Sequence, residues 1–161
     1  MAIVLLRVDE RLIHGQVVVG WGGPLHIDRF VVVDDAIAAS AWEQELYCLG
    51  VPAEMEASFA SVDQARGQVA EWRDGTKRVI VLVRDVGTAL RLAEGGLLEG
   101  VEVNLGGIHH AEGRRAVLPY LHLGDGDGDA LRRIAATGAK VSARDLPASR
   151  KVPLDELLEQ P

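Results

Sequence analysis

Short apolar runs alternate along this chain with longer segments in which apolar residues recur three or four positions apart. The short runs are rich in β-branched residues and lack polar alternation, which is typical of strands buried on both faces of a sheet. They are AIVLLRV, RFVVVDD, KRVIVLVRD, VEVNLGG, YLHLG and AKVSARD. A weaker run, EMEASFA, alternates Met55, Ala57 and Phe59 and is predicted to be a half-buried edge strand.

The intervening segments carry helical spacing. One apolar stripe at i, i+4 and i+7 consists of Trp42, Leu46 and Leu49. It predicts an amphipathic helix over residues 36–49. Capping residues and similar stripes predict further helices after Ser61, after Asp85, before Gly138 and after Pro153.

Regular alternation of strands and helices predicts an α/β fold. Right-handed crossovers then give a doubly wound, mainly parallel sheet of six to seven strands with helices on both faces. An antiparallel edge strand is possible. The chain has 161 residues and no internal repeat or linker, so residues 1–161 are expected to form a single domain.

Composition narrows the class of protein. The net charge is −7, with 17 basic against 24 acidic residues, which argues against a nucleic-acid partner. Cys48 is the only cysteine, so a disulfide framework within the chain is impossible and a reducing compartment is expected. No basic segment precedes the first apolar run, and no run reaches the length of a membrane span. We therefore expect a cytoplasmic protein, which can still dock on a membrane protein.

The segment RVDERLIHGQV, residues 7–17, interrupts the apolar pattern between the first strand and the first helix. Ligands of open α/β sheets bind beyond the carboxyl ends of the strands, where this segment lies. A helix cap would explain one polar residue there, but Asp9, Glu10, Arg11 and His14 are more than one cap requires.

His14 precedes Gly15 at the expected start of a helix, where free N–H groups favour a phosphate. Arg11 can bind phosphate oxygens, and Asp9 can hold one ring nitrogen while the other acts as nucleophile. These are the parts of a phosphohistidine site. From the chemistry alone, a polar cap or filler remains the alternative for His14.

The same segment closely resembles the signature of the mannose/sorbose-family EIIB component of the phosphoenolpyruvate-dependent sugar phosphotransferase system. Supporting similarities are VVVDD at 31–35, VNLGGI at 103–108 and the late VSARDLP segment. The resemblance covers essentially the whole chain. It departs from the family at Ala39-Ser40, where an acidic residue is frequent.

The resemblance implies an enzyme, a protein-N(pi)-phosphohistidine–sugar phosphotransferase. His14 would accept a phosphoryl group from the phosphohistidine of an EIIA partner and pass it to a sugar that enters through membrane components EIIC and EIID. Asp9 and Arg11 match the residues that flank the family histidine. Backbone N–H groups at Ile13, Gly15 and Gln16 would bind the phosphoryl oxygens. A homodimer is a possible assembly.

Other polar and glycine residues near the strand ends are possible contacts for substrate or partner. They are Arg7, Asp34, Arg84, Asn104, Gly106 and Gly107. Gly106-Gly107 is interpreted as a turn beside the phosphate. No cofactor is expected, because the chain lacks G-x-x-x-x-G-K-[ST], and no metal is expected at His109-His110 or in the GDGDGD loop.

Three further residues are predicted to take no part in phosphoryl transfer. Cys48 is interpreted as a small buried thiol. His26 is expected at the opposite end of the sheet, and His122 is expected in the core.

Two alternative functions remain open at this point. One is a regulatory phosphoacceptor that is phosphorylated at His14 and passes nothing to sugar. The other, weaker one is a nucleotide or small-molecule module that uses Gly106-Gly107.

Overall fold

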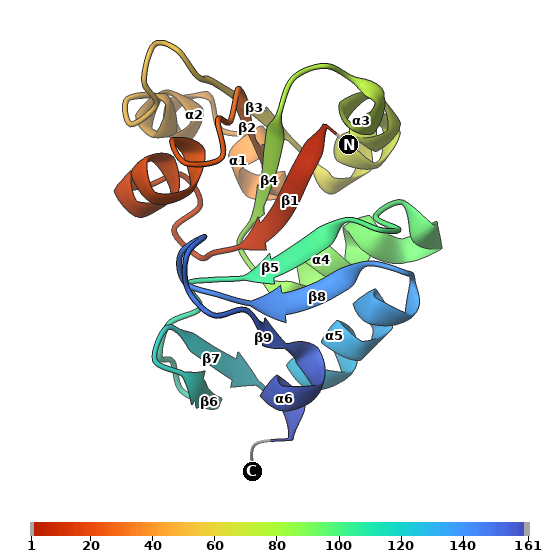
Figure 1. Ribbon diagram of the computed structural model, residues 1–161. Helices are drawn as coiled ribbons and strands as arrows, with labels where there is room; N and C mark the ends of the chain where they lie inside the picture. Colours follow the sequence, from red (N-terminus) through yellow and green to blue (C-terminus); the bar gives the residue numbers. More distant parts are fainter. Residues whose placement is uncertain (1, 160–161) are drawn as a thin grey trace.

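The computed structural model describes residues 2–159 and is built on a central seven-stranded sheet (Figure 1). Its strands are β1 (Ile3–Val8), β2 (Arg29–Val33), β3 (Glu56–Ala60), β4 (Val79–Val83), β5 (Glu102–Leu105), β8 (Lys140–Ala143) and β9 (Val152–Pro153). Their order in the sheet is β3-β2-β4-β1-β5-β8-β9. Every pairing is parallel except that of β8 with β9, which is antiparallel. The predicted strand number, mainly parallel pairing and antiparallel edge are confirmed.

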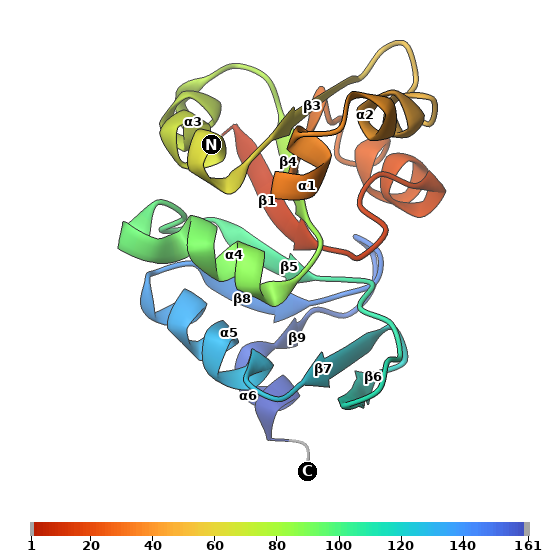
Figure 2. The same cartoon turned by 180° about the vertical axis from the view of Figure 1, so that it is seen from behind.

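Helices cover the sheet on both faces, as predicted. They are η1 (Gln16–Gly22), α1 (Asp35–Ala38), α2 (Ala41–Cys48), α3 (Val62–Asp74), α4 (Val86–Ala93), η2 (Glu94–Gly96), α5 (Asp127–Ala136) and α6 (Leu154–Leu158). Figure 2 shows α3, α4 and α5 on one side of the sheet. Their apolar residues form one core cluster, and η1 with α1 contributes to a second cluster on the other side.

Local sequence explains most of these elements. All five residues of β4 are buried, as its unbroken apolar run requires. The predicted capping box at Ser61 and Gln64 starts α3, with both reciprocal hydrogen bonds present. Asp85 caps α4 by accepting a hydrogen bond from the N–H of Thr88. The edge strand predicted around Met55 is β3, and it pairs in parallel with β2.

The helix predicted over residues 36–49 is wrong in two respects. It breaks into α1 and α2 at Ser40, which has an extended backbone, and the Gln44 amide donates to the carbonyls of Ile37 and Ala38 across the break. Because the helix restarts there, α2 is oriented independently of α1, and Tyr47 contacts Phe59 beside the core.

The apolar stripe of α2 therefore faces solvent and not the core. Trp42, Leu46 and Leu49 are 65%, 52% and 84% exposed. Cys48 is also exposed, so its interpretation as a buried thiol is wrong. The periodicity identified a helix but not the side on which it packs.

The segment YLHLG is a strand outside the main sheet. It forms β7 (Leu121–Gly124), which pairs antiparallel with β6 (Arg114–Leu118) in a separate two-stranded sheet. His122 in β7 is only half-buried, so its prediction as a core residue is wrong. The polar composition of β6, RRAVL, gave no strand signal of its own.

This topology places the segment after β1 at the carboxyl edge of the sheet. β1, β4 and β2 run parallel, so His26, which precedes β2, lies at the opposite edge from His14, as predicted. Among residues 2–159, no helix is both long and apolar enough to cross a bilayer.

Candidate active site

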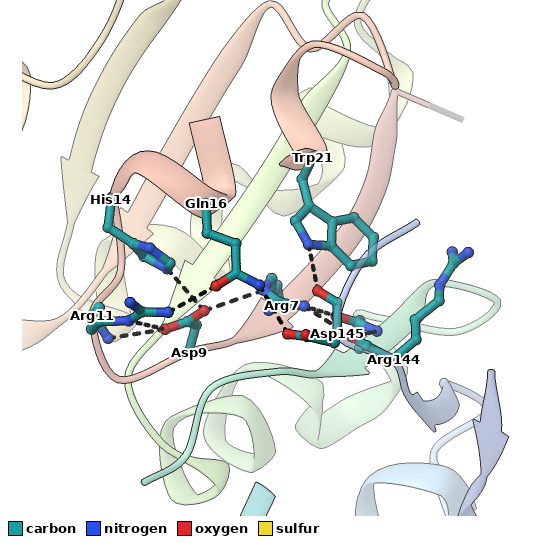
Figure 3. A network of polar contacts seen from close by, with 9 residues as sticks. Arg7, Asp9, Arg11, His14, Gln16, Trp21, Arg144 and Asp145 are labelled. Carbon is teal, nitrogen blue, oxygen red and sulfur yellow. Dashed lines mark hydrogen bonds and ion pairs between the residues drawn. The ribbon is translucent and has the colours of Figure 1, made fainter. Parts of the chain in front are cut away.

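His14 stands above Asp9 in the loop between β1 and η1 (Figure 3). Its Nε2 atom lies 3.0 Å from Oδ2 of Asp9. The carboxylate is fully buried, whereas the His14 side chain keeps 14% of its surface exposed. Because an ionised carboxylate can only accept, Nε2 carries the ring proton in this contact. Nδ1 then keeps its lone pair and has no hydrogen-bond partner within residues 2–159.

A tight reversal of the loop brings His14 back over Asp9. The Asp9 carbonyl accepts from the N–H of Leu12, and Oδ1 of Asp9 accepts from the N–H of Arg11 at 3.0 Å. Leu12 adopts a positive φ of 57° and is fully buried. A left-handed leucine costs about 1–2 kcal/mol. Burial of its side chain and the turn hydrogen bonds offset this cost.

Arg7 supports Asp9 from below. It is 1% exposed, and its Nε lies 3.3 Å from Oδ2 of Asp9. Its Nη1 donates to Oδ1 of Asn104 at 2.6 Å and to the Arg144 carbonyl at 3.2 Å. Its guanidinium carbon lies 4.8 Å from the centre of the Trp21 ring. These partners offset the cost of burying the Arg7 charge, because a buried charge without partners would strongly destabilise the fold.

The surroundings of Asp9 keep it ionised. Burial opposes ionisation, but the hydrogen bond from His14, the charge of Arg7 and the N–H of Arg11 together outweigh it and lower the pKa of Asp9. Burial lowers the pKa of Arg7, and Asp9 counters this. Arginine nevertheless stays protonated at physiological pH. The site thus holds a fixed negative charge directly under the imidazole.

Gly106 and Gly107 form the wall of this buried pair. A Cβ atom at Gly106 would lie 2.2 Å from Cζ of Arg7, and one at Gly107 would lie 3.1 Å from Oδ1 of Asp9. Both glycines are buried, and the Gly107 carbonyl accepts from the N–H of Glu10. They make room for the ion pair below the site and do not expose backbone to a ligand.

Gly106→Ala should therefore destabilise the fold by about 3 kcal/mol, the upper part of the range for overpacking. The clashing guanidinium cannot move away, because it is held by Asp9 and Asn104. Urea unfolding measures the loss. Gly67→Ala is the matched control, because its Cβ meets nothing within 4 Å in α3 and should stabilise by about 0.5–1 kcal/mol. Equal behaviour of the two variants would contradict this reading of Gly106.

Arg11 and Gln16 complete the rim around the imidazole (Figure 3). Arg11 is 48% exposed and lies with Nε 3.9 Å from Oδ1 of Asp9. Its Nη2 donates to Oε1 of Gln16 at 3.1 Å. Gly15 is exposed, with open space where a Cβ would be, and Ile13 is buried in the core. The loop therefore anchors through Ile13 and leaves the backbone at Gly15 accessible.

The structure divides the remaining predicted contact residues into two groups. Arg7 and Asn104 are buried, so they support the site and cannot touch a partner directly. Asp34 and Arg84 lie past β2 and β4 and pair with each other at 3.1 Å. Asp34 also caps α1 through the N–H of Ile37, as the cap interpretation allowed.

Several residues at the site carried no chemical signal in the sequence. Trp21, Arg144 and Asp145 belong to the network below and beside the imidazole. Glu10 binds Arg114 of β6 and lies 3.4 Å from Nδ1 of His109, which ties the β6–β7 sheet to the loop. The VSARDLP segment was noted only for its resemblance, and only the tertiary fold brings it here.

Comparison with known proteins assigns the chain to a family. A family model described as "PTS system sorbose subfamily IIB component" matches residues 3–161. The chain belongs to this family. The match confirms the resemblance found in residues 7–17 and, through it, a component of a phosphotransferase system that serves sugar uptake.

Individual members of the EIIB family agree over most of the chain. The N-acetylgalactosamine-specific phosphotransferase enzyme IIB component 1 of Escherichia coli K12 is 31% identical over 152 residues, which cover 92% of this chain and 94% of that protein. The mannose-specific EIIAB component of the same strain is 28% identical over 99% of this chain, which spans only 49% of that relative. A crystal structure of an N-acetyl-galactosamine IIB component from Streptococcus pyogenes superposes with a TM-score of 0.87 at 27% identity, covering 97% of each chain.

Proposed function

We propose that this EIIB protein is a phosphohistidine relay. His14 accepts a phosphoryl group from the phosphohistidine of an EIIA partner and passes it to a sugar that enters through EIIC and EIID. One observation carries the proposal: Nε2 of His14 is held by a buried, ionised Asp9, while Nδ1, on a partly exposed ring, has no partner in the described part of the chain.

In the first step, the Nδ1 lone pair of His14 attacks phosphorus. The bond between phosphorus and the donor imidazole breaks, and its electron pair returns to that imidazole. The His14 ring keeps its proton on Nε2 and gains positive charge, which the Asp9 carboxylate 3.0 Å away stabilises. No metal or nucleotide takes part in this proposal.

Positive groups around the ring bind the phosphoryl oxygens. Phosphoryl transfer passes through a loose transition state with charge on these oxygens, so positioning and electrostatics supply most of the catalysis. The Arg11 guanidinium beside the ring can turn toward them. The N–H groups of Gly15 and Gln16 precede the first helical hydrogen bond of η1, from the Val18 N–H to the His14 carbonyl, and such groups at the start of a helix can bind the oxygens as well.

In the second step, a sugar hydroxyl oxygen attacks the phosphorus. The bond from Nδ1 to phosphorus breaks and its electron pair returns to His14. The hydroxyl proton passes to a base on the protein that presents the sugar, because Asp9 is buried and already holds three donors. The exposed edge of the His14 ring suits a site that must meet two partners in turn.

The partners follow from this sequence of steps. The name of the mannose-specific relative, EIIAB component, joins two such parts in one protein, which supports an EIIA donor. We propose that residues 1–161 form one EIIB domain that works on the cytoplasmic side of the membrane, against EIIC and EIID. The acceptor is a hexose or amino sugar, since the two relatives named above are specific for mannose and N-acetylgalactosamine.

Membrane vesicles that contain the cognate EIIC and EIID test the proposal. The protein is first phosphorylated by EIIA and isolated, and loss of its phosphate is then followed with and without sugar. We expect sugar-dependent loss of the protein-bound phosphate and equal formation of sugar phosphate. Phosphorylation on His14 without any sugar-dependent loss would support a regulatory phosphoacceptor and overturn the relay.

A further inference from the structure

The loop after β8 reaches the phosphoryl site through a chain of two hydrogen bonds. Gln16 Nε2 donates to Oδ1 of Asp145 at 2.9 Å, and Oε1 of the same amide accepts from Nη2 of Arg11 at 3.1 Å. Figure 3 shows the three side chains in a row beside the His14 ring. Asp145 is therefore linked to Arg11, an exposed cation that lies beside the imidazole in Figure 3.

The position of Asp145 is fixed by the core beneath it. Its carbonyl accepts from Nε1 of Trp21 at 3.0 Å, and Trp21 is fully buried. The carbonyl of the preceding residue, Arg144, accepts from Nη1 of buried Arg7 at 3.2 Å. The Trp21 ring also lies between the Arg7 and Arg144 guanidinium carbons, at 4.8 and 5.2 Å. The backbone at Asp145 is thus held to β1 and η1.

The charge of Asp145 decides which way the Gln16 amide points. A carboxylate only accepts hydrogen bonds, so Gln16 must turn its NH2 group toward Asp145 and its oxygen toward Arg11. If the amide turned over, its NH2 group would face the Arg11 guanidinium, where two donors meet without an acceptor. With the amide fixed, its oxygen offers Arg11 a hydrogen-bond acceptor beside His14.

We propose that Asp145 is a positioning residue for phosphoryl transfer, acting through Gln16 to orient Arg11 toward the phosphoryl group on His14. This inference rests on the proposed function of His14. Asp145 does not touch the reacting atoms. It removes alternative orientations of Arg11 before the phosphoryl group arrives, so less ordering remains for the transition state.

Phosphorylation by phosphoramidate, a small donor that needs no protein partner, tests this role. The initial rate of His14 phosphorylation is measured for wild type and for Asp145→Ala. We expect the variant to be about threefold to tenfold slower, the factor that one net hydrogen bond represents. Asp145→Asn can either accept from or donate to the Gln16 amide, so it no longer fixes the direction of that amide and should be slowed to a similar extent. Asp129→Ala, which changes an exposed aspartate of α5, is the matched control and should leave the rate unchanged.

A double-mutant cycle separates positioning from a merely structural effect. In an Arg11→Ala background, adding Asp145→Ala should change the rate no further, because the group to be positioned is absent. An equal loss in both backgrounds would overturn the inference, as would a wild-type rate in Asp145→Ala alone. Wild-type protein that gains no phosphate on His14 would instead overturn the proposed function, so the two failures are distinguishable.

Discussion

His14→Ala should accept no phosphoryl group from phosphorylated EIIA. Nδ1 of the partly exposed imidazole has no hydrogen-bond partner among residues 2–159, and the buried Asp9 beneath the ring is held by three donors. Removal of a nucleophile lowers turnover by about 10⁶ in a well-studied hydrolase, so label should fall below detection. Acid-labile incorporation of labelled phosphate measures the loss.

The matched control for this experiment is His26→Ala. His26 is exposed at the opposite edge of the sheet, so its removal should leave labelling at the wild-type level. Labelling that survives in His14→Ala, or that disappears in His26→Ala, would refute His14 as the acceptor. Thermal unfolding of both variants shows whether the fold is retained.

Asp9→Asn should lower the rate of phosphoryl transfer by up to about 10⁴, the loss that the same change in an orienting aspartate causes in a serine protease. The new amide can donate its NH2 group to Nε2, which moves the ring proton to Nδ1 and removes the attacking lone pair. The ring also loses the negative charge that stabilises its phosphorylated form. Transfer from EIIA, measured at saturating donor, gives the rate.

The same substitution should cost about 3–5 kcal/mol of stability, because it leaves the Arg7 charge buried without its partner. Combining it with Arg7→Met separates the two effects. The double variant should regain part of the stability in urea unfolding and none of the transfer rate. Recovery of transfer along with stability would show that Asp9 acts only through the fold.

The parts of the fold that the sequence predicted are those set by local signals. The buried run of β4, the capping box at Ser61 and Gln64 and the cap at Asp85 each depend on neighbours within a few residues. The grouping of Asp9, Arg11 and His14 could also be predicted, because these residues lie within one short segment of the sequence.

The rest depends on contacts between distant parts of the chain. The buried network joins Arg7 to Asn104 and the Arg144 carbonyl, and Trp21 to the Asp145 carbonyl. No periodicity in the sequence reports these pairings. The sequence alone suggested that Gly106 belongs to a turn beside the phosphate. In the structure, the lack of a side chain at Gly106 makes room for the guanidinium of Arg7, which is 99 positions away in the sequence.

Helix α2 shows the limit of amphipathic pattern more clearly. Its stripe of Trp42, Leu46 and Leu49 is regular. Because the helix breaks at Ser40, however, α2 does not continue the direction of α1, and the stripe faces solvent. A stripe reports that one face is apolar, and what covers that face depends on the neighbouring elements. The same reasoning explains the exposed Cys48.

The account depends most on Asp9 holding Nε2 of His14 and leaving Nδ1 to bind phosphorus. Nitrogen-15 NMR of the phosphorylated protein, with histidine labelled, distinguishes the two ring nitrogens directly. The account predicts a single phosphohistidine at position 14 with phosphorus on Nδ1 and the proton retained on Nε2. Phosphorus on Nε2 would require the contact with Asp9 to break and would contradict it.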